Sequence, residues 1–205
     1  MTPVRKHPEP TVGRGRPREF DTEAALANAM QVFWAKSYAG ASLTDLTEAM
    51  GITRPSLYAA YGNKDTLFKR AFELYEKDRL AYVFEALEAP TARGVVRQML
   101  AGTIENVSKE SRGCLGVTAL ASCNDANPDV QQEVQARVEV FRDLITARFQ
   151  QAIEQGEFEK PTSAEAMALY LMAVLQGLSI QAGAGASREQ LHGVAEAALA
   201  VWPSC

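Results

Sequence analysis

The stretch from residue 42 to residue 64, SLTDLTEAMGITRPSLYAAYGNK, constrains the fold most, because it predicts two short helices that meet at a glycine. Ser42 can cap the first helix together with Asp45, three residues later. The apolar residues of that helix share one face at helical spacing: Leu46, Ala49 and Met50. Gly51 then allows the left-handed backbone that a tight turn between helices requires.

The second helix is expected to begin after Thr53, whose hydroxyl can cap it, with Pro55 in its first turn. Because so short a helix is unstable alone, Ile52 and Leu57 should anchor it. Two helices joined by a glycine turn form the helix-turn-helix motif, whose second helix enters the major groove of DNA with its N-terminal residues on base edges. The stretch therefore predicts DNA binding.

Seven side chains of this stretch are candidate DNA contacts. Arg54 and Ser56 lie at the start of the second helix, where arginine can offer two donors to guanine and serine can donate or accept. The others are placed to hold the DNA backbone, which fixes register without reading bases: Thr44, Thr53, Tyr58, Tyr61 and Lys64. Taken singly, Tyr58 or Tyr61 would be a packing residue, and Lys64 a solvated lysine that the helix dipole disfavours.

The run from Phe20 to Phe72, with LTDLTEAMGITRPSLYAAYGNKDTLF at its centre, resembles the DNA-binding domain of the tetracycline-repressor (TetR) family of bacterial transcriptional regulators. Two residues depart from the family pattern. Thr47 stands where alanine is usual, and Ala60 stands where a histidine or tyrosine commonly touches phosphate. The resemblance implies a C-terminal helical domain that forms a homodimer through its last two helices and encloses an effector cavity.

Charge is distributed unevenly along the chain. Residues 1–70 carry 10 Lys and Arg against 7 Asp and Glu, whereas the remaining residues carry 11 against 18. A basic N-terminal part on an acidic remainder is typical of a protein that presents one end to nucleic acid.

Other functional classes find little support. No G-x-S-x-G, H-E-x-x-H or phosphate-loop pattern occurs, and the only histidines are His7 and His192, so we expect no enzyme, cofactor or metal site. Three cysteines without a CxxC pair favour neither a disulfide framework nor zinc. The first residues hold no apolar segment and no uninterrupted apolar span reaches ~18 residues, so we expect a cytoplasmic protein outside the membrane.

Residues 1–19 are rich in Pro, Gly and Arg and lack periodicity, which predicts a disordered basic arm. Its Arg-Gly-Arg-Pro segment resembles an AT-hook core, in which Arg14 and Arg16 would lie in a narrow minor groove. A basic tail that only aids solubility is the alternative. An architectural DNA-binding protein that uses this arm alone is a competing interpretation, although it would not need the large acidic remainder.

An all-α fold is expected throughout, with a helix-turn-helix domain at 20–65 and an effector-binding and dimerisation domain at 66–205. A first helix capped by Asp21 should run to about residue 36, and a continuous helix should run from 64 to about 88. Further helix boundaries are expected at local signals: Pro90 with Thr91, Ser122, Asn127 with Pro128 up to Gly156, the capping box of Thr162 and Glu165, and that of Ser187 and Gln190.

The helix after Thr162, AMALYLMAVLQGLSI, is apolar almost all round and must be covered on every side. Its own domain and a second copy of the chain would do this, and the resulting twofold dimer predicts an inverted-repeat operator in double-stranded DNA. Candidate residues for a small-molecule effector pocket are Phe84, Met99, Thr103, Cys114, Phe141 and Tyr170. Ordinary core packing is the alternative for each, and oxidation or alkylation of Cys114 or Cys123 is an alternative trigger.

Overall fold

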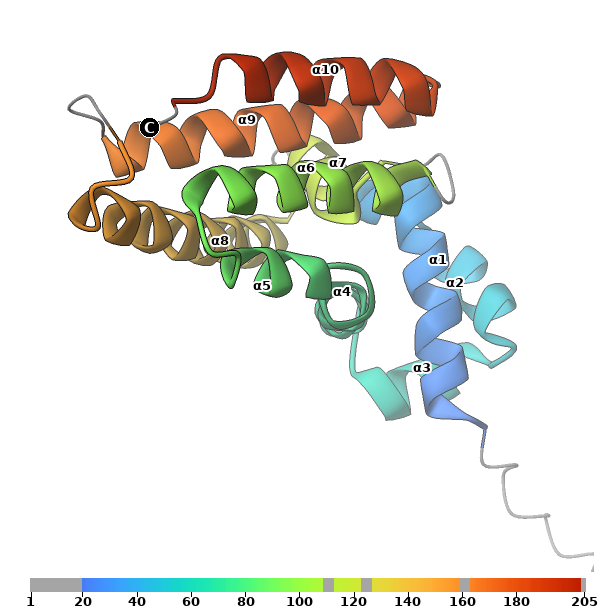
Figure 1. The fold of residues 1–205 in the computed structure, drawn as a ribbon. Coiled ribbons are helices and arrows are strands. Elements are labelled where there is room, and N and C mark those ends of the chain that lie inside the picture. Colours follow the sequence, from blue (N-terminus) through green and yellow to red (C-terminus); the bar gives the residue numbers. More distant parts are fainter. Residues whose placement is uncertain (1–19, 109–112, 123–126, 159–162, 204–205) are drawn as a thin grey trace, which may run out of the picture.

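The computed structural model describes residues 20–108, 113–122, 127–158 and 163–203. These ranges contain ten α-helices and no strand, so the predicted all-α fold is confirmed (Figure 1). The helices are α1 (Thr22–Gly40), α2 (Leu43–Met50), α3 (Arg54–Tyr61), α4 (Lys64–Arg79), α5 (Ala81–Leu87), α6 (Ala92–Ser108), α7 (Leu115–Ser122), α8 (Pro128–Glu154), α9 (Ala164–Gly183) and α10 (Arg188–Ala200). We call α1–α4 the head and α5–α10 the body.

Local capping signals set most helix starts. Asp21 accepts from the backbone N–H groups of Glu23 and Ala24, at 3.0 and 3.1 Å. Asn127 caps α8 directly before its proline, and Ser187 forms the expected capping box with Gln190 at α10. Thr162 lies outside the described residues, and α9 is capped instead by Ser163, which accepts from Ala166 N at 3.2 Å.

The core of the head contains seven buried aromatic side chains. They come from α1, α3 and α4: Phe33, Trp34, Tyr38, Tyr61, Phe68, Phe72 and Tyr75. Leu115 and Ala119 of α7, with Val130 and Val134 of α8, complete the same core. The body therefore contributes directly to the surface on which the helix-turn-helix rests.

The continuous helix predicted over residues 64–88 is wrong, because the chain breaks at Leu80 between α4 and α5. Leu80 has φ −110° and ψ 9°, outside the helical region. Phe68, Phe72 and Tyr75 face the core of the head, whereas Val83 and Ala86 face the core of the body, and Leu80 packs against both. The helix turns at Leu80 because the two cores lie in different directions.

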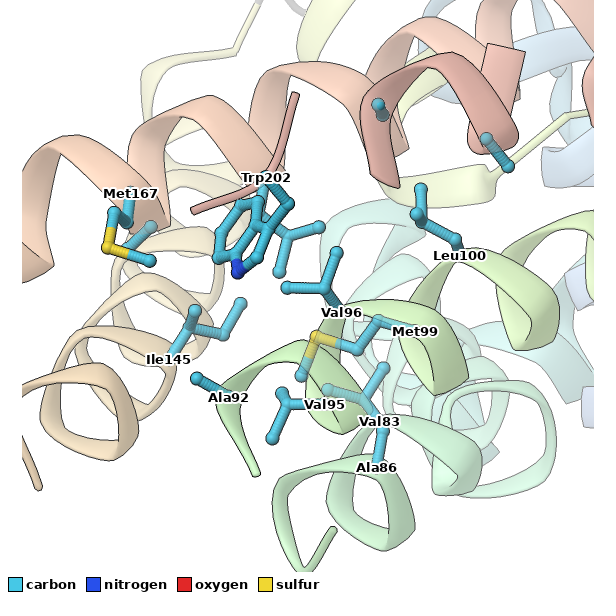
Figure 2. Packing of buried hydrophobic residues seen from close by; sticks show 14 of the residues in the cluster. Val83, Ala86, Ala92, Val95, Val96, Met99, Leu100, Ile145, Met167 and Trp202 are labelled. Atoms are coloured by element: carbon cyan, nitrogen blue, oxygen red, sulfur yellow. The ribbon is translucent and has the colours of Figure 1, made fainter. Parts of the chain in front are cut away.

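The body packs α6, α8, α9 and α10 around a core of aliphatic side chains, methionines and Trp202 (Figures 1 and 2). Figure 2 shows the indole of Trp202 among Val96, Ile145 and Met167, which come from three different helices. The turn between α5 and α6 is fixed from α8, because Arg148 donates to the carbonyl oxygens of Leu87 and Ala89 at 3.2 and 2.9 Å. The arrangement leaves the outer sides of α9 and α10 uncovered.

The α9 helix is long and apolar enough to cross a membrane by length and composition alone, but it packs as a core helix on one side. Met167, Leu171 and Leu178 are buried there. On other sides the large apolar side chains Leu169 and Ile180 are 50% and 58% exposed. The apolar surface of α9 thus exceeds what the chain itself can cover.

Candidate nucleic-acid interface and cavity

The first helix of the helix-turn-helix, α2, begins with a complete capping box. Ser42 Oγ accepts from Asp45 N at 3.0 Å, and Asp45 Oδ2 accepts from Ser42 N at 2.9 Å. Lys36 Nζ from α1 lies 2.6 Å from Asp45 Oδ1. The hydrogen bond from Lys36, followed by those from Ser42, holds the pKa of Asp45 well below its ordinary value. This carboxylate therefore caps α2 and also links it to α1.

The turn and the start of α3 follow the sequence prediction. Gly51 has φ 66°, in the left-handed region that glycine favours. Thr53 Oγ1 accepts from Ser56 N at 3.3 Å and lies 2.9 Å from Ser56 Oγ. Arg54 Nη2 donates to Thr44 Oγ1 at 2.8 Å on an exposed surface. Four predicted contact residues are thus gathered at the N-terminus of α3, where the helix dipole favours an anion.

The two tyrosines of α3 have different environments. Tyr58 is 48% exposed, whereas Tyr61 is 4% exposed and its hydroxyl donates to the carbonyl oxygen of Thr22 at 2.8 Å. Burial raises the pKa of Tyr61. The predicted phosphate contact by Tyr61 does not fit this position, because the ring is needed inside the head with Leu57. Only Tyr58 faces solvent as predicted.

Lys64 begins α4 after Asn63, which caps the helix by accepting from Thr66 N at 2.8 Å. Lys64 Nζ lies 4.4 Å from the ring centroid of Tyr38. Arg70, which the sequence analysis did not single out, donates to the carbonyl oxygen of Ala60 at 3.4 Å and so supports the end of α3. No local pattern relates a residue of α4 to a carbonyl ten positions earlier.

The two departures from the family pattern have simple local environments. Thr47 is buried, and its hydroxyl donates to the carbonyl oxygen of Leu43 at 2.9 Å within α2, so the extra polar group is satisfied. Ala60 is half-buried at the end of α3. Neither residue distorts the helix in which it lies.

A cavity of about 110 Å³ lies between α4–α9. Four of the six predicted pocket residues line it: Met99, Thr103, Cys114 and Phe141. The predictions for Phe84 and Tyr170 are wrong, because Phe84 is 54% exposed with its ring 5.9 Å from Phe141, and Tyr170 is 42% exposed beside Trp202. Both lie on apolar helix stripes, and the stripe alone does not say which residues face the cavity.

The polar groups in the cavity wall mostly bind one another. Tyr82 OH lies 2.9 Å from Thr103 Oγ1, and burial raises the pKa of Tyr82 to about 12. Asn106 Nδ2 donates to Tyr75 OH at 3.2 Å, and burial, followed by the neighbouring Cys114, raises the pKa of Tyr75 far above its ordinary value. Gln176 also lines the cavity, and its side chain has no hydrogen-bond partner among the described residues.

Arg137 of α8 joins the cavity wall to the head. Its guanidinium binds Glu76 and, at 3.2 Å, Glu73 on α4, and it also binds Glu133 at 2.9 Å. Burial raises the pKa of Glu76 despite this contact. For Glu133, burial works in the same direction, but the hydrogen bonds from Arg137 and Lys69 outweigh it and lower the pKa. A charged group already paired in this way offers little to a charged ligand.

Several predicted residues lie outside the described part of the chain. They are Arg14 and Arg16 of the N-terminal arm, and Cys123. Cys114 is described and is a free thiol of intermediate burial. Within the described residues no group of three His, Cys, Asp or Glu side chains could hold a metal ion.

Comparisons with known proteins cover both halves of the chain. Residues 25–71 match the family described as bacterial regulatory proteins, tetR family, and residues 90–198 match the tetracyclin repressor-like C-terminal domain. The chain is 33% identical over 196 residues to the HTH-type transcriptional repressor ComR of Escherichia coli, covering 93% of this chain and 92% of ComR. It is 30% identical over 183 residues to the HTH-type transcriptional repressor BdcR of the same organism, covering 86% of each.

Solved structures agree. A cysteine mutant of the TetR family transcriptional regulator CifR, complexed with 26-bp double-strand operator DNA, superposes with a TM-score of 0.86 at 39% identity. The match covers 92% of this chain and all of that one. A putative TetR transcriptional regulator from Rhodococcus sp. RHA1 has a TM-score of 0.62 at 37% identity, covering 90% of this chain and all of its own.

Proposed function

The chain belongs to the TetR family of bacterial regulators, which are DNA-binding transcription factors rather than enzymes, and from this we propose that it is a repressor released from an inverted-repeat operator by a small molecule. The observation that supports the proposal most is the gathering of Thr44, Arg54 and Ser56 at the exposed N-terminus of α3. It would act in the cytoplasm, where its DNA target is.

In this proposal Arg54 reads a base, and Thr44 is its hydrogen-bond partner in the absence of DNA. The hydrogen bond from Arg54 to Thr44 holds the guanidinium on the surface before DNA arrives, and DNA binding exchanges it for guanine acceptors. Ser56 reads a neighbouring base edge, while Thr53, Tyr58 and Lys64 hold phosphates. Tyr61 supports them from inside the head.

The proposed dimer joins two chains through α9 and α10. Large apolar side chains remain exposed on these two helices and at the end of α10: Leu169, Tyr170, Ile180, Val194 and Val201. A four-helix bundle made from two copies would cover them. Two heads related by a twofold axis would place their α3 helices about one DNA turn apart, ~34–36 Å.

The proposed effector is small, neutral and largely apolar. Cavities of about 150 Å³ lined by apolar side chains bind benzene, so 110 Å³ suits a molecule of that size or smaller. Among the described lining residues the charged groups are Glu76 and Arg137, which bind each other, whereas Gln176 can hydrogen-bond to a polar substituent. An effector in the cavity would favour one arrangement of α4 against α8. It would lower operator affinity by an amount set by the difference between its own affinities for the two arrangements.

A salt series of operator binding tests the DNA contacts. Footprinting upstream of the neighbouring genes supplies the operator fragment. We expect log affinity to fall linearly with log salt, and Lys64→Gln to reduce the slope by about one.

Arg54→Ala should instead reduce the preference for one base pair of the operator by about 1–3 kcal/mol. Arg54→Lys should lose the two-donor contact but keep the charge. Lack of binding to every fragment of the locus would overturn the proposal.

The cysteine alternative retains one supporting observation, because Cys114 lines the cavity and adjoins Tyr75. A regulator of this kind would lose operator affinity on treatment with peroxide or an alkylating agent. Cys114→Ser would abolish that response, while unchanged operator affinity of the treated wild-type protein removes the alternative.

Deletion of residues 1–19 tests the alternative of an architectural DNA-binding protein. If the shortened protein keeps its operator specificity, this alternative is wrong.

A further inference from the structure

Tyr38 lies at a strained point between the helix-turn-helix and the body. It follows Ser37, whose φ of 59° and ψ of 174° belong to a region that residues other than glycine rarely adopt. The turn directs Tyr38 into the head, where it is 7% exposed and its ring centroid lies 5.3 Å from that of Phe68. The sequence alone indicated only a helix end here.

The hydroxyl of Tyr38 connects two helices that are distant in sequence. It donates to Asp65 Oδ1 in the first turn of α4, and it accepts from Asn127 Nδ2, the N-cap of α8, at 3.1 Å. The three groups form a chain of hydrogen bonds that runs in one direction and ends on a carboxylate, so each bond strengthens the next. The face of the same ring lies under Lys64 Nζ, at 4.4 Å.

We propose that Tyr38 is a positioning residue for Lys64, and that the hydrogen bond from Asn127 makes the position of Lys64 depend on α8. The inference rests on the proposed phosphate contact of Lys64. A lysine at the first residue of a helix is disfavoured by the helix dipole, so its ammonium needs a fixed partner. The ring of Tyr38 supplies one.

The link to α8 gives this contact a regulatory meaning. Val138 and Phe141 of α8 line the cavity, and Asn127 caps the same helix ~16 Å from Val138. A helix moves as a rigid rod over this distance, so a shift at the cavity reaches Asn127. The bond to Tyr38 then transmits it to Asp65 and Lys64.

Two substitutions test these roles one at a time. One separates the role of the Tyr38 hydroxyl from that of its ring, and the other separates the hydrogen bond that Asn127 donates from its role as the cap of α8. Tyr38→Phe keeps the ring under Lys64 and removes the hydroxyl. Asn127→Asp keeps an oxygen that caps α8, because aspartate accepts the same backbone N–H groups, but removes the donor to Tyr38. Ser163→Asp is the matched control, since it makes the same kind of cap exchange and adds the same charge at α9.

The measurement is affinity for the footprinted operator fragment across a salt series, with the thermal midpoint of each variant. We expect Y38F to weaken binding about three- to tenfold and to move the salt slope toward that of K64Q. N127D should show a smaller loss of the same kind, and S163D should match the wild type. In a K64Q background, Y38F should change affinity less than about twofold, because the group it positions is already gone.

The outcomes distinguish the two proposals. If K64Q leaves the salt slope unchanged, the phosphate contact of Lys64 is overturned. If K64Q reduces the slope but Y38F and N127D bind as the wild type does, the contact stands and the positioning role of Tyr38 is overturned. An equal loss from Y38F in the wild-type and K64Q backgrounds would assign Tyr38 a structural role only and would also overturn the inference.

Discussion

The head and the body of this regulator are packed with different kinds of side chain. In the head the rings pack on one another both edge to face and stacked: Phe33 and Phe68 have centroids 5.1 Å apart and planes at 88°, whereas the planes of Phe68 and Phe72 differ by only 18°. In the body the buried residues are mainly alanine, valine, leucine and methionine, and one side of that core opens onto the 110 Å³ cavity. The cavity is therefore bordered mainly by helices of the body.

This difference matches the different tasks of the two parts. Aromatic pairs have a narrow range of favourable geometries, and all four helices of the head begin with a side-chain cap: Asp21, Ser42, Thr53 and Asn63. The α5 helix of the body begins at Leu80 without one. A rigid head keeps the DNA contacts in register, while a body with empty volume can change its packing when a ligand enters.

The largest expected effect tests this difference with one core truncation in each part. Phe68 is fully buried and its ring contacts Phe33, Tyr38 and Phe72, so Phe68→Ala should lower the free energy of unfolding by about 3–5 kcal/mol. Met99 is equally buried, but it already borders empty space and loses fewer contacts, so Met99→Ala should cost about 2 kcal/mol. Urea unfolding at one fixed protein concentration measures both. Equal costs would show that the body is as tightly packed as the head.

Features that depend on neighbours in sequence were predictable. The caps at Asp21, Ser42, Thr53, Asn127 and Ser187 all follow from a polar side chain two or three residues before the backbone N–H groups it accepts from. The left-handed turn at Gly51 is equally local. These signals, with the apolar periodicity, were enough to predict the helix-turn-helix and the all-helical fold.

Features that depend on distant packing were not predictable. Leu80 is a good helix former with no proline or glycine beside it, and only the different directions of the two cores break the helix there. Tyr58 and Tyr61 are the same residue type, and the hydrogen bond that Tyr61 makes to Thr22 on α1 is a distant contact that no local pattern gives. Phe84 was misassigned for the same reason, since it lies one residue away from the buried Val83.

Two glycines in contact with the cavity wall sharpen the comparison. A Cβ at Gly102 would lie 2.1 Å from Tyr82 Cδ2, so Gly102→Ala must displace this ring and break its hydrogen bond to Thr103. We expect a loss of about 1–3 kcal/mol in unfolding free energy. A Cβ at Gly116 would meet Phe72 at 3.4 Å and Cys114 Sγ at 3.7 Å, which are ordinary contacts. Gly116→Ala should therefore raise the free energy of unfolding by about half a kcal/mol through helix propensity, and it should reduce the volume of the cavity.

Chemical unfolding of both glycine variants and of the wild type measures the changes in unfolding free energy. Opposite signs are expected from the same chemical change, because one wall position is filled by Tyr82 and the other borders empty space. If both variants are destabilised equally, the cavity near Gly116 is closed in solution, and the proposed effector site loses its support.

The smallest expected effect concerns the pH dependence of the head. Hydrogen bonds from Lys36 and Ser42 lower the pKa of Asp45 below its ordinary value of 3.8, so the unfolded chain binds the proton more readily. The stability that this carboxylate contributes is fully present well above that value and is lost as the pH falls below it. Asp45→Asn should therefore be less stable than the wild type at neutral pH, and the gap should narrow toward about pH 3. Glu48→Gln, on the same helix outside the capping box, is the matched control. Asp45 links α1 to α2. If the difference in unfolding free energy between the wild type and Asp45→Asn stayed constant with pH, packing rather than the charge of Asp45 would stabilise this contact between the two helices.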